Sequence, residues 1–100
     1  MNFTVELSDA AQEDLTAIRD RKVVQDITNG LLRLEVEPAK RGKSLKVELK
    51  GYYSVRLARQ RYRAVYSVAV QQGVVTVIVI ALRRAGSKDD PYKVAKRRLG

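Results

Sequence analysis

The 100-residue sequence contains no cysteine, no histidine and no tryptophan. Without cysteine the chain has no disulfide and no thiol nucleophile, and without both cysteine and histidine it lacks the usual zinc ligands. The missing histidine also removes the side chain that most often titrates near neutral pH and serves as a general base. Catalysis by a Ser-His or Cys-His pair is therefore excluded.

The sequence also lacks a long hydrophobic run. The longest one, Val74 to Leu82, has the length of a β-strand and falls short of the roughly 18 residues that a membrane span needs. The opening residues, MNFTVELSD, have neither the basic lead nor the apolar core of a secretory signal. We therefore expect a cytoplasmic protein with a single domain over residues 1–100.

Negative charge is scarce in the larger, later part of the chain. Residues 1–38 contain four lysines and arginines against eight acids, a net charge of −4, whereas residues 39–100 contain sixteen against three, a net charge of +13. Such segregation favours a basic surface for an anionic partner. The alternative is a generally basic protein whose lysines and arginines are simply solvated.

The hydrophobic pattern predicts an α+β domain. Residues 2–7 alternate as a strand does, and helical spacing follows from Ser8, whose hydroxyl is a suitable N-cap, until Pro38 ends a second helix. The remaining expected elements are a short extended segment at 45–49, strands at 53–57, 62–68 and 74–82, and a helix that starts at Asp90-Pro91. Gln71-Gln72-Gly73 reads as a hairpin loop, with Gly73 in the left-handed conformation. This order predicts a mainly antiparallel sheet packed by helices.

Arginines alternate along two neighbouring predicted strands. Ser54 and Arg56 share one face of the first strand, Arg61 and Arg63 share one face of the next, and Arg84 follows the third. If these faces coincide, the guanidinium groups surround one groove, and a guanidinium binds phosphate through two parallel hydrogen bonds. The alternative is a row of surface arginines with solvated tips. Lys43, Lys46 and Lys50 would add charge from the preceding loop and strand.

The sequence offers no nucleophile of its own, because its serines have no histidine to activate them and the carboxylates needed for two-metal chemistry are missing. RNA supplies a nucleophile in its 2′-hydroxyl group. Arg56, Arg63 and Arg84 could then stabilise the charge on the reacting phosphate, and Tyr92 or a lysine could transfer a proton. The chemistry expected is thus RNA cleavage without a metal or other cofactor.

Several ordered segments carry a family resemblance: SDAAQEDL after the first strand, the pattern P-x-x-x-G-K-x-L at residues 38–45, GYYSVRL, RYRAVY, and DDPY before the last helix. Together they make nearly the whole chain resemble the RelE/ParE superfamily of bacterial type II toxin–antitoxin toxins. The resemblance implies a RelE-like β-α-α-β-β-β-α fold. It also implies a toxin that cleaves mRNA, usually in the ribosomal A site, and is neutralised by a cognate antitoxin in a hetero-oligomer.

The resemblance further implies a catalytic set of Arg56, Arg63, Arg84 and Tyr92. The chain departs from the family pattern at Ser54, where a lysine is usual, and at Arg83, which takes the place of a histidine. The residues expected to bind RNA around the catalytic set are Lys43, Lys46, Lys50, Ser54, Arg61, Arg83 and Lys88. Two other functions stay open: a ParE-like inhibitor of DNA gyrase, and a non-catalytic module that binds RNA or the ribosome through the same basic face.

Overall fold

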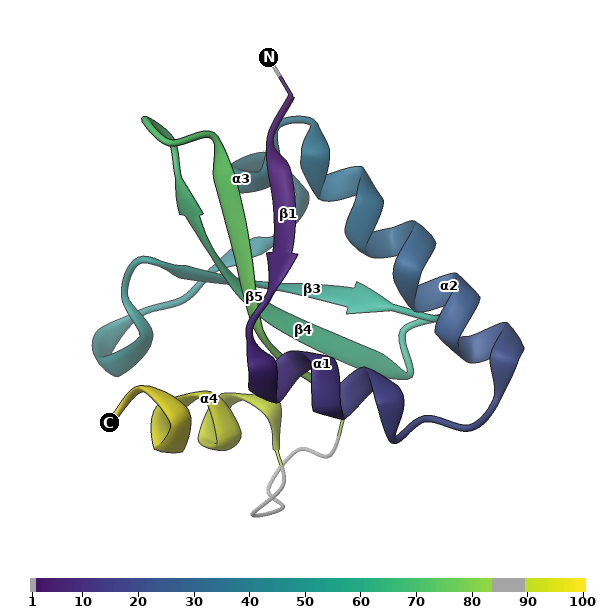
Figure 1. The fold of residues 1–100 in the computed structure, drawn as a ribbon. Helices are drawn as coiled ribbons and strands as arrows, with labels where there is room; N and C mark the ends of the chain where they lie inside the picture. The colour runs from purple at the N-terminus through teal and green to yellow at the C-terminus, as the bar shows by residue number, and fades with distance from the viewer. Residues whose placement is uncertain (1, 84–89) are drawn as a thin grey trace.

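The computed structural model describes residues 2–83 and 90–100, which form an α+β fold with a five-stranded, mostly antiparallel sheet (Figure 1). The strands are β1 (Thr4–Leu7), β2 (Lys43–Ser44), β3 (Tyr52–Leu57), β4 (Tyr62–Ala69) and β5 (Val74–Leu82). The helices are α1 (Asp9–Thr16), α2 (Arg21–Leu32), α3 (Pro38–Arg41) and α4 (Pro91–Leu99), with short 3₁₀ turns η1 (Arg33–Glu35) and η2 (Val47–Leu49). The predicted fold class is confirmed.

The sheet order is β1-β5-β4-β3-β2, with β1 parallel to β5 and the other neighbours antiparallel. The hairpin β3–β4 pairs Arg56 directly with Arg63, and β2 pairs Lys43 with Ser54. The β4–β5 loop has the predicted left-handed glycine, Gly73, at φ 67°. Basic residues from three strands therefore lie next to one another in the sheet.

Helices α1 and α4 begin at side-chain caps that the sequence predicts. The hydroxyl of Ser8 accepts a hydrogen bond from the Ala11 amide at 3.1 Å, which starts α1. The carboxylate of Asp90 accepts one from the Tyr92 amide at 2.8 Å, with Pro91 at the first helical position of α4. The cap at Asp90 consequently sets where Tyr92 leaves the first turn of α4.

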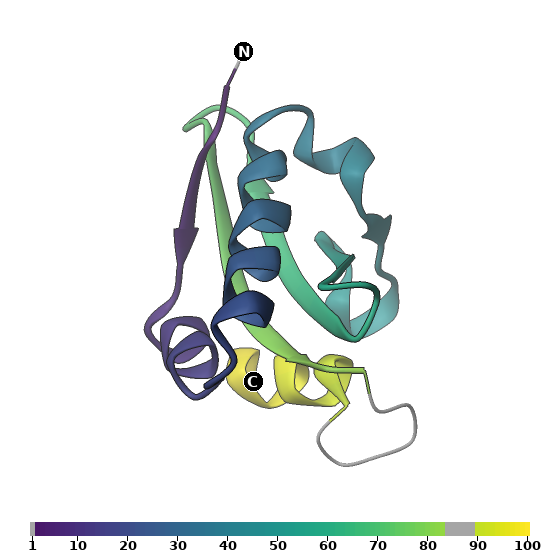
Figure 2. The same ribbon diagram turned by 90° about the vertical axis from the view of Figure 1, so that its right-hand side faces the viewer.

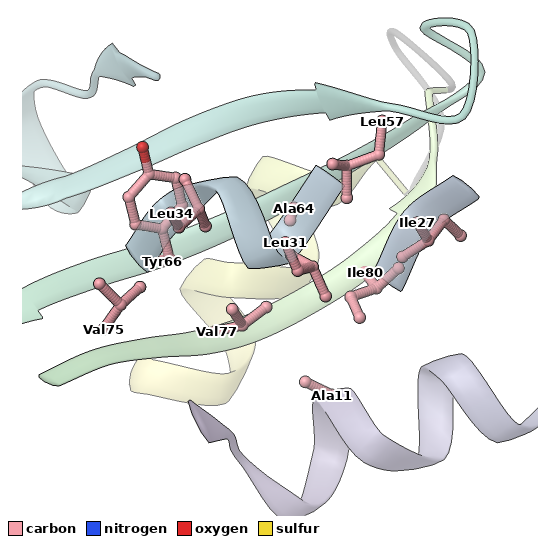
Figure 3. Close-up of a cluster of buried hydrophobic side chains, with 10 residues drawn as sticks. All are labelled: Ala11, Ile27, Leu31, Leu34, Leu57, Ala64, Tyr66, Val75, Val77 and Ile80. Carbon is pink, nitrogen blue, oxygen red and sulfur yellow. The ribbon is translucent and has the colours of Figure 1, made fainter. Parts of the chain in front are cut away.

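Helices α1 and α2 cover one face of the sheet. Ala11 of α1 and Ile27 and Leu31 of α2 pack against side chains of β3, β4 and β5, as Figure 3 shows with α4 behind the strands. Figure 2 shows α2 lying lengthwise along the sheet and α1 nearly end-on. Gly30 allows α2 to approach β3 closely, since a Cβ at this position would lie 2.4 Å from Leu57 Cδ2.

The opposite face of the sheet is covered by α4 and η2. Ala95 of α4 and Leu49 of η2 pack with Val65 and Val79 in a second, smaller core cluster. Strand β5 is therefore apolar on both faces, as its continuous hydrophobic run predicts. A register shift opposite Val65 and Tyr66 accommodates the extra residue Ile78 in β5. The basic groups of β3 and β4 lie on this second face, beside α4.

Two expectations along the chain were wrong in detail. The alternation at residues 45–49 predicted an extended segment, but the chain turns there into η2, because Leu45 and Leu49 both pack into the second cluster. Val47 at the turn is left-handed (φ 57°) and its side chain stays exposed. Pro38 does not end α2, which finishes at Leu32, but instead opens α3.

No helix within residues 2–83 and 90–100 has the length and hydrophobicity needed to cross a membrane.

Candidate functional site

A hollow of about 390 Å³ lies between the basic strands and the start of α4. Its lining comes from five elements or their connections: Arg41, Gly42, Lys43, Ser54, Val55, Arg56, Arg63 and Tyr92. Four of these eight residues have cationic side chains and none has a carboxylate. The hollow is therefore suited to an anion, and phosphate matches the fork geometry of its three arginines.

Tyr92 is held by contacts from both basic strands. Arg63 donates a hydrogen bond from Nη1 to the Tyr92 hydroxyl, and its guanidinium carbon also lies 5.3 Å from the centroid of the Tyr92 ring. Ser54 Oγ lies 3.2 Å from the same hydroxyl, at hydrogen-bond distance. Because Arg63 can only donate, the phenol proton remains available for Ser54 or for a bound substrate.

Arg56 and Arg63 stand opposite each other across β3 and β4, an arrangement of like charges that is normally destabilising. Each guanidinium is drawn to a different neighbour. Arg63 reaches α4 through Tyr92, whereas Arg56 donates from Nη1 to Gln60 Oε1 at 3.2 Å. The Nε of Arg63 is buried and has no hydrogen-bond partner among the described residues. Leaving such a donor unpaired costs about 1–3 kcal/mol, so this cluster is not explained by stability.

The P-x-x-x-G-K segment forms one wall of the hollow. The hydroxyl of Tyr66 donates a hydrogen bond to the Pro38 carbonyl at 2.7 Å, which fixes α3 on the sheet. Gly42 passes close to this bond, and a Cβ there would lie 2.4 Å from the Tyr66 hydroxyl and 2.6 Å from the Ser54 carbonyl oxygen. Burial, with a smaller effect of Tyr53, raises the pKa of Tyr66 to about 12. The motif thus places Lys43 beside Ser54 and has a structural role.

A second hollow of about 510 Å³ shares Lys43, Arg63 and Tyr92 with the first. Leu45 and Leu49 supply apolar surface to its lining, and Lys46 and Lys96 add two further cations. Lys96 also lies 3.4 Å from Glu48 in an exposed ion pair. Tyr92 therefore stands between two adjoining hollows, both lined by cationic side chains.

The structure brings together most, but not all, of the residues expected at the site. Ser54, Arg56, Arg63, Tyr92, Lys43 and Lys46 line the two hollows. Arg61 was expected beside Arg63 but lies in the turn before β4, and neither Arg61 nor Lys50 nor Arg83 lines either hollow. The Arg83 amide instead donates to the Arg61 carbonyl at 2.9 Å, at the far end of the β4–β5 ladder. Arg84 and Lys88 lie outside the described residues.

Sequence reasoning missed three residues of this region: Arg41, Gln60 and Lys96. Arg41 belongs to the basic segment AKRGK, so its charge was visible, but its place beside Arg56 depends on the fold of α3. Lys96 follows Tyr92 by four positions on α4, a helical spacing that places the two on one face. No sequence signal marks Gln60, which reaches Arg56 from a turn of three successive left-handed residues, 58–60.

The model of the family described as ParE toxin of the type II toxin–antitoxin system parDE matches residues 5–86. Comparison with the sequences of curated proteins found no match.

Solved structures with the same fold come from toxin–antitoxin systems. The toxin–antitoxin complex RelBE2 from Mycobacterium tuberculosis matches with 25% identity and a TM-score of 0.75, covering 83% of this chain and 100% of that one. A double mutant of the E. coli toxin RelE in the free state has 22% identity and a TM-score of 0.76, with both chains fully covered. The chromosomal ParDE system of P. aeruginosa has 23% identity and a TM-score of 0.64, covering 80% of this chain and 95% of that one.

Proposed function

This chain belongs to the ParE toxin family of type II toxin–antitoxin systems, within the RelE/ParE superfamily, and from that premise we propose that it is an endoribonuclease that cleaves mRNA during translation. The observation that carries the proposal is the Tyr92 hydroxyl, held by Arg63 and Ser54 in a cationic hollow. Holding a proton-transfer group against a fixed cation, where an anion can enter, is the arrangement that phosphodiester cleavage requires.

In the proposed reaction the 2′-hydroxyl oxygen of the RNA attacks the adjacent phosphorus and loses its proton. The bond from phosphorus to the 5′-oxygen of the next nucleotide breaks, and that oxygen gains a proton. The products are a 2′,3′-cyclic phosphate and a 5′-hydroxyl group, so no water, metal or cofactor is consumed. Tyr92 is the candidate for one of the two proton transfers, because its hydroxyl can both donate and accept a hydrogen bond and lies against the guanidinium of Arg63.

The arginines stabilise the negative charge that develops on the phosphoryl group in this step. Arg63 lies against Tyr92, and Arg56 faces it from the paired strand, so an anion in the hollow is within reach of guanidinium groups from two strands. Removing one such donor typically lowers the rate by about 10²–10³. Arg84, which lies outside the described residues, keeps its proposed role in this set on the strength of the family resemblance alone.

A cognate antitoxin is the partner that we propose for this toxin. Several of the similar structures are described as toxin–antitoxin complexes, among them RelBE2 of M. tuberculosis and intact RelBE of E. coli. Residues 39–100 have a net charge of +13, which suits an acidic neutralising segment. We expect a hetero-oligomer whose affinity falls as salt is raised.

The test is primer extension on an mRNA that is translated in the presence of the purified protein. We expect new 3′ ends at fixed positions within codons, carrying a cyclic phosphate. Intact message under conditions where the protein arrests growth would overturn the proposal. A reaction without ribosomes shows in parallel whether cleavage needs translation.

Inhibition of DNA gyrase is the second candidate, and the match of residues 5–86 to the ParE family supports it. This activity does not need a nuclease site, so it would be indifferent to the contacts of Tyr92. A supercoiling assay with purified gyrase separates the two candidates. Blocked supercoiling together with uncut message would establish the gyrase function in place of the nuclease.

A further inference from the structure

A third hollow, of about 400 Å³, lies between α2 and the β3–β4 turn, away from Tyr92. Arg33 at the end of α2 and Arg59 in the turn line it, and Arg56 lines both this hollow and the one that contains Tyr92. A smaller hollow of about 210 Å³, lined by Arg33, Arg41 and Arg56 among others, lies between them. Because Arg56 lines all three hollows, the hollows adjoin one another, and we name them together the groove.

We define the arginine track as Arg41, Arg56, Arg33 and Arg59, in their order along this groove. They come from four different places in the chain: α3, β3, the end of α2 and the β3–β4 turn. Their convergence is thus a property of the tertiary structure. Gly30 and Leu57 lie at the middle of the groove, where their close contact brings α2 and β3 together.

The track is not neutralised by the protein itself. Within residues 2–83 and 90–100, Asp26 is the one carboxylate in the lining of the three hollows, and it pairs with Lys22 at 3.1 Å. None of the four arginines has an ion-pair partner within the described residues. Gathering four unpaired cations along one groove is unfavourable unless an anion with several charges occupies it.

The turn that ends the track is held in an unusual conformation. Ala58, Arg59 and Gln60 all have positive φ angles, of 50°, 58° and 69°, although none is glycine. Each left-handed residue of this kind costs roughly 1 kcal/mol or more, and such conformations cluster at functional sites. The result of the strain is specific: Arg59 lies in the third hollow, and Gln60 holds Arg56 between the two hollows.

We infer that the arginine track binds the sugar-phosphate backbone of the RNA strand on one side of the cleaved phosphate, over at least two further phosphates. This inference rests on the proposed nuclease function. A single strand fits better than a duplex, because the groove includes the hollow where the 2′-hydroxyl must attack in line. Among the residues that the structure describes, the lining of the two hollows beyond Tyr92 holds no aromatic side chain. Without a surface for base stacking, the track binds every sequence alike, and codon preference must arise elsewhere.

The test uses a fully 2′-O-methylated RNA decamer, which cannot be cleaved, and the matching dinucleotide, which has a single phosphate. Binding of each to the purified protein is measured by fluorescence anisotropy over a range of salt concentrations. The variant is Arg33→Ala/Arg59→Ala, and the matched control is Arg19→Ala/Arg21→Ala, which removes the same charge from exposed residues outside the groove. Arg33→Lys/Arg59→Lys tests whether charge alone is sufficient.

We expect the Arg33→Ala/Arg59→Ala variant to bind the decamer at least tenfold more weakly and the dinucleotide as the wild type does. The slope of log affinity against log salt should fall by about 1.4, because each lost phosphate contact on a single strand contributes about 0.7. The control should keep both values, and the lysine variant should keep the slope. Thermal unfolding of each variant shows that the fold is intact.

Equal binding of the decamer by variant and wild type, or an equal loss of affinity in the control, overturns the inferred role of the arginine track. If the variant instead loses affinity for an acidic peptide and not for RNA, the groove is a protein-docking surface and the inference is wrong. Cleavage of translated message by the wild type shows whether a negative result concerns the arginine track alone or also the proposed nuclease function. With cleavage intact, a failed track leaves the proposed function standing, whereas a wild type that neither cuts nor binds RNA ends both.

Discussion

Arg98 near the end of α4 and Asp14 in α1 form a bidentate ion pair, with Nη1–Oδ2 and Nη2–Oδ1 distances of 2.7 and 2.8 Å. The pair sits where the ladder between β1 and β5 has ended, at Val77. Beyond that point Asp14 accepts a hydrogen bond from the Ile80 amide at 2.9 Å, and Arg98 donates one to the Ile78 carbonyl at 2.7 Å. The two side chains therefore provide hydrogen-bond partners for backbone groups of β5 beyond the end of the ladder. They also hold α4, the helix that carries Tyr92, on the face of the sheet opposite to α1.

Asp14→Ala should lower the free energy of unfolding by about 2–3 kcal/mol, because it removes hydrogen bonds to a charged group and leaves the Ile80 amide unpaired. The hydrogen bonds to Asp14 also raise the pKa of Arg98, so its guanidinium stays charged. Urea unfolding measures the loss. Lys22→Ala removes the more exposed Lys22–Asp26 pair and should change stability by less than about 1 kcal/mol. Equal effects of the two substitutions would contradict the structural role of Asp14.

Tyr92→Phe should lower the rate of RNA cleavage by about 10²–10⁴ while leaving the fold intact. Phenylalanine keeps the ring beside Arg63 and removes only the hydroxyl that Arg63 and Ser54 contact. Single-turnover cleavage of an RNA substrate measures the rate. Tyr62→Phe is the control, because Tyr62 packs on the other face of the sheet. If the Tyr92→Phe variant stays fully toxic, Tyr92 is not part of the catalytic site.

Arg63→Ala should abolish toxicity, and Arg63→Lys should restore only a small part of it. Lysine supplies the charge but not the planar fork that can contact Tyr92 and a phosphate together. Growth arrest on induction of each variant, with antitoxin withheld, is the measurement. Arg61→Ala provides the matched control, since Arg61 was expected at the site but lies in the turn and lines neither hollow. Equal losses at positions 61 and 63 would show that net charge matters more than geometry.

Tyr66→Phe should destabilise the protein by about 1 kcal/mol near neutral pH, because the Pro38 carbonyl loses its hydrogen bond. The difference should shrink above pH 10 and then reverse. The pKa of Tyr66 is about 12 in the folded protein and near 10 when unfolded, so its contribution is complete below pH 10 and is lost as the pH rises towards 12. The full loss is about 2–3 kcal/mol. Denaturant unfolding of wild type and variant at pH 8, 10 and 11 checks the trend, which a constant difference would refute.

Gly42→Ala should lower stability by about 2–3 kcal/mol and weaken cleavage, because the new Cβ would meet a buried hydroxyl and a backbone carbonyl that cannot move away. Gly30→Ala should cost less. Its Cβ meets the end of the Leu57 side chain, which can rotate, and alanine gains about 1 kcal/mol over glycine inside a helix. Thermal unfolding and cleavage assays compare the two. A larger effect at position 30 would show that the wall at Gly42 is not rigid.

Much of the fold could be predicted from local patterns. Alternation correctly assigned the faces of β3 and β4, and the caps at Ser8 and Asp90 began α1 and α4 where expected. These features depend on residues close together in the chain. The prediction failed at 45–49, where the alternation of Leu45 and Leu49 reflects packing in a turn and not a strand.

The candidate site was likewise predictable in part from local patterns and in part only from the tertiary structure. The sequence by itself determined that cations and a tyrosine are present, that thiol and histidine chemistry is absent, and that Ser54, Arg56 and Arg63 belong to facing strands. Only the tertiary structure decided that α4 brings Tyr92 onto Arg63, that Arg61 is excluded, and that Arg33 and Arg59 continue the groove beyond Arg56. The reason is physical. Periodicity fixes the face of a strand or helix on which a side chain lies. A contact between residues 29 or more positions apart, such as that of Arg63 with Tyr92, depends on how helices pack on the sheet.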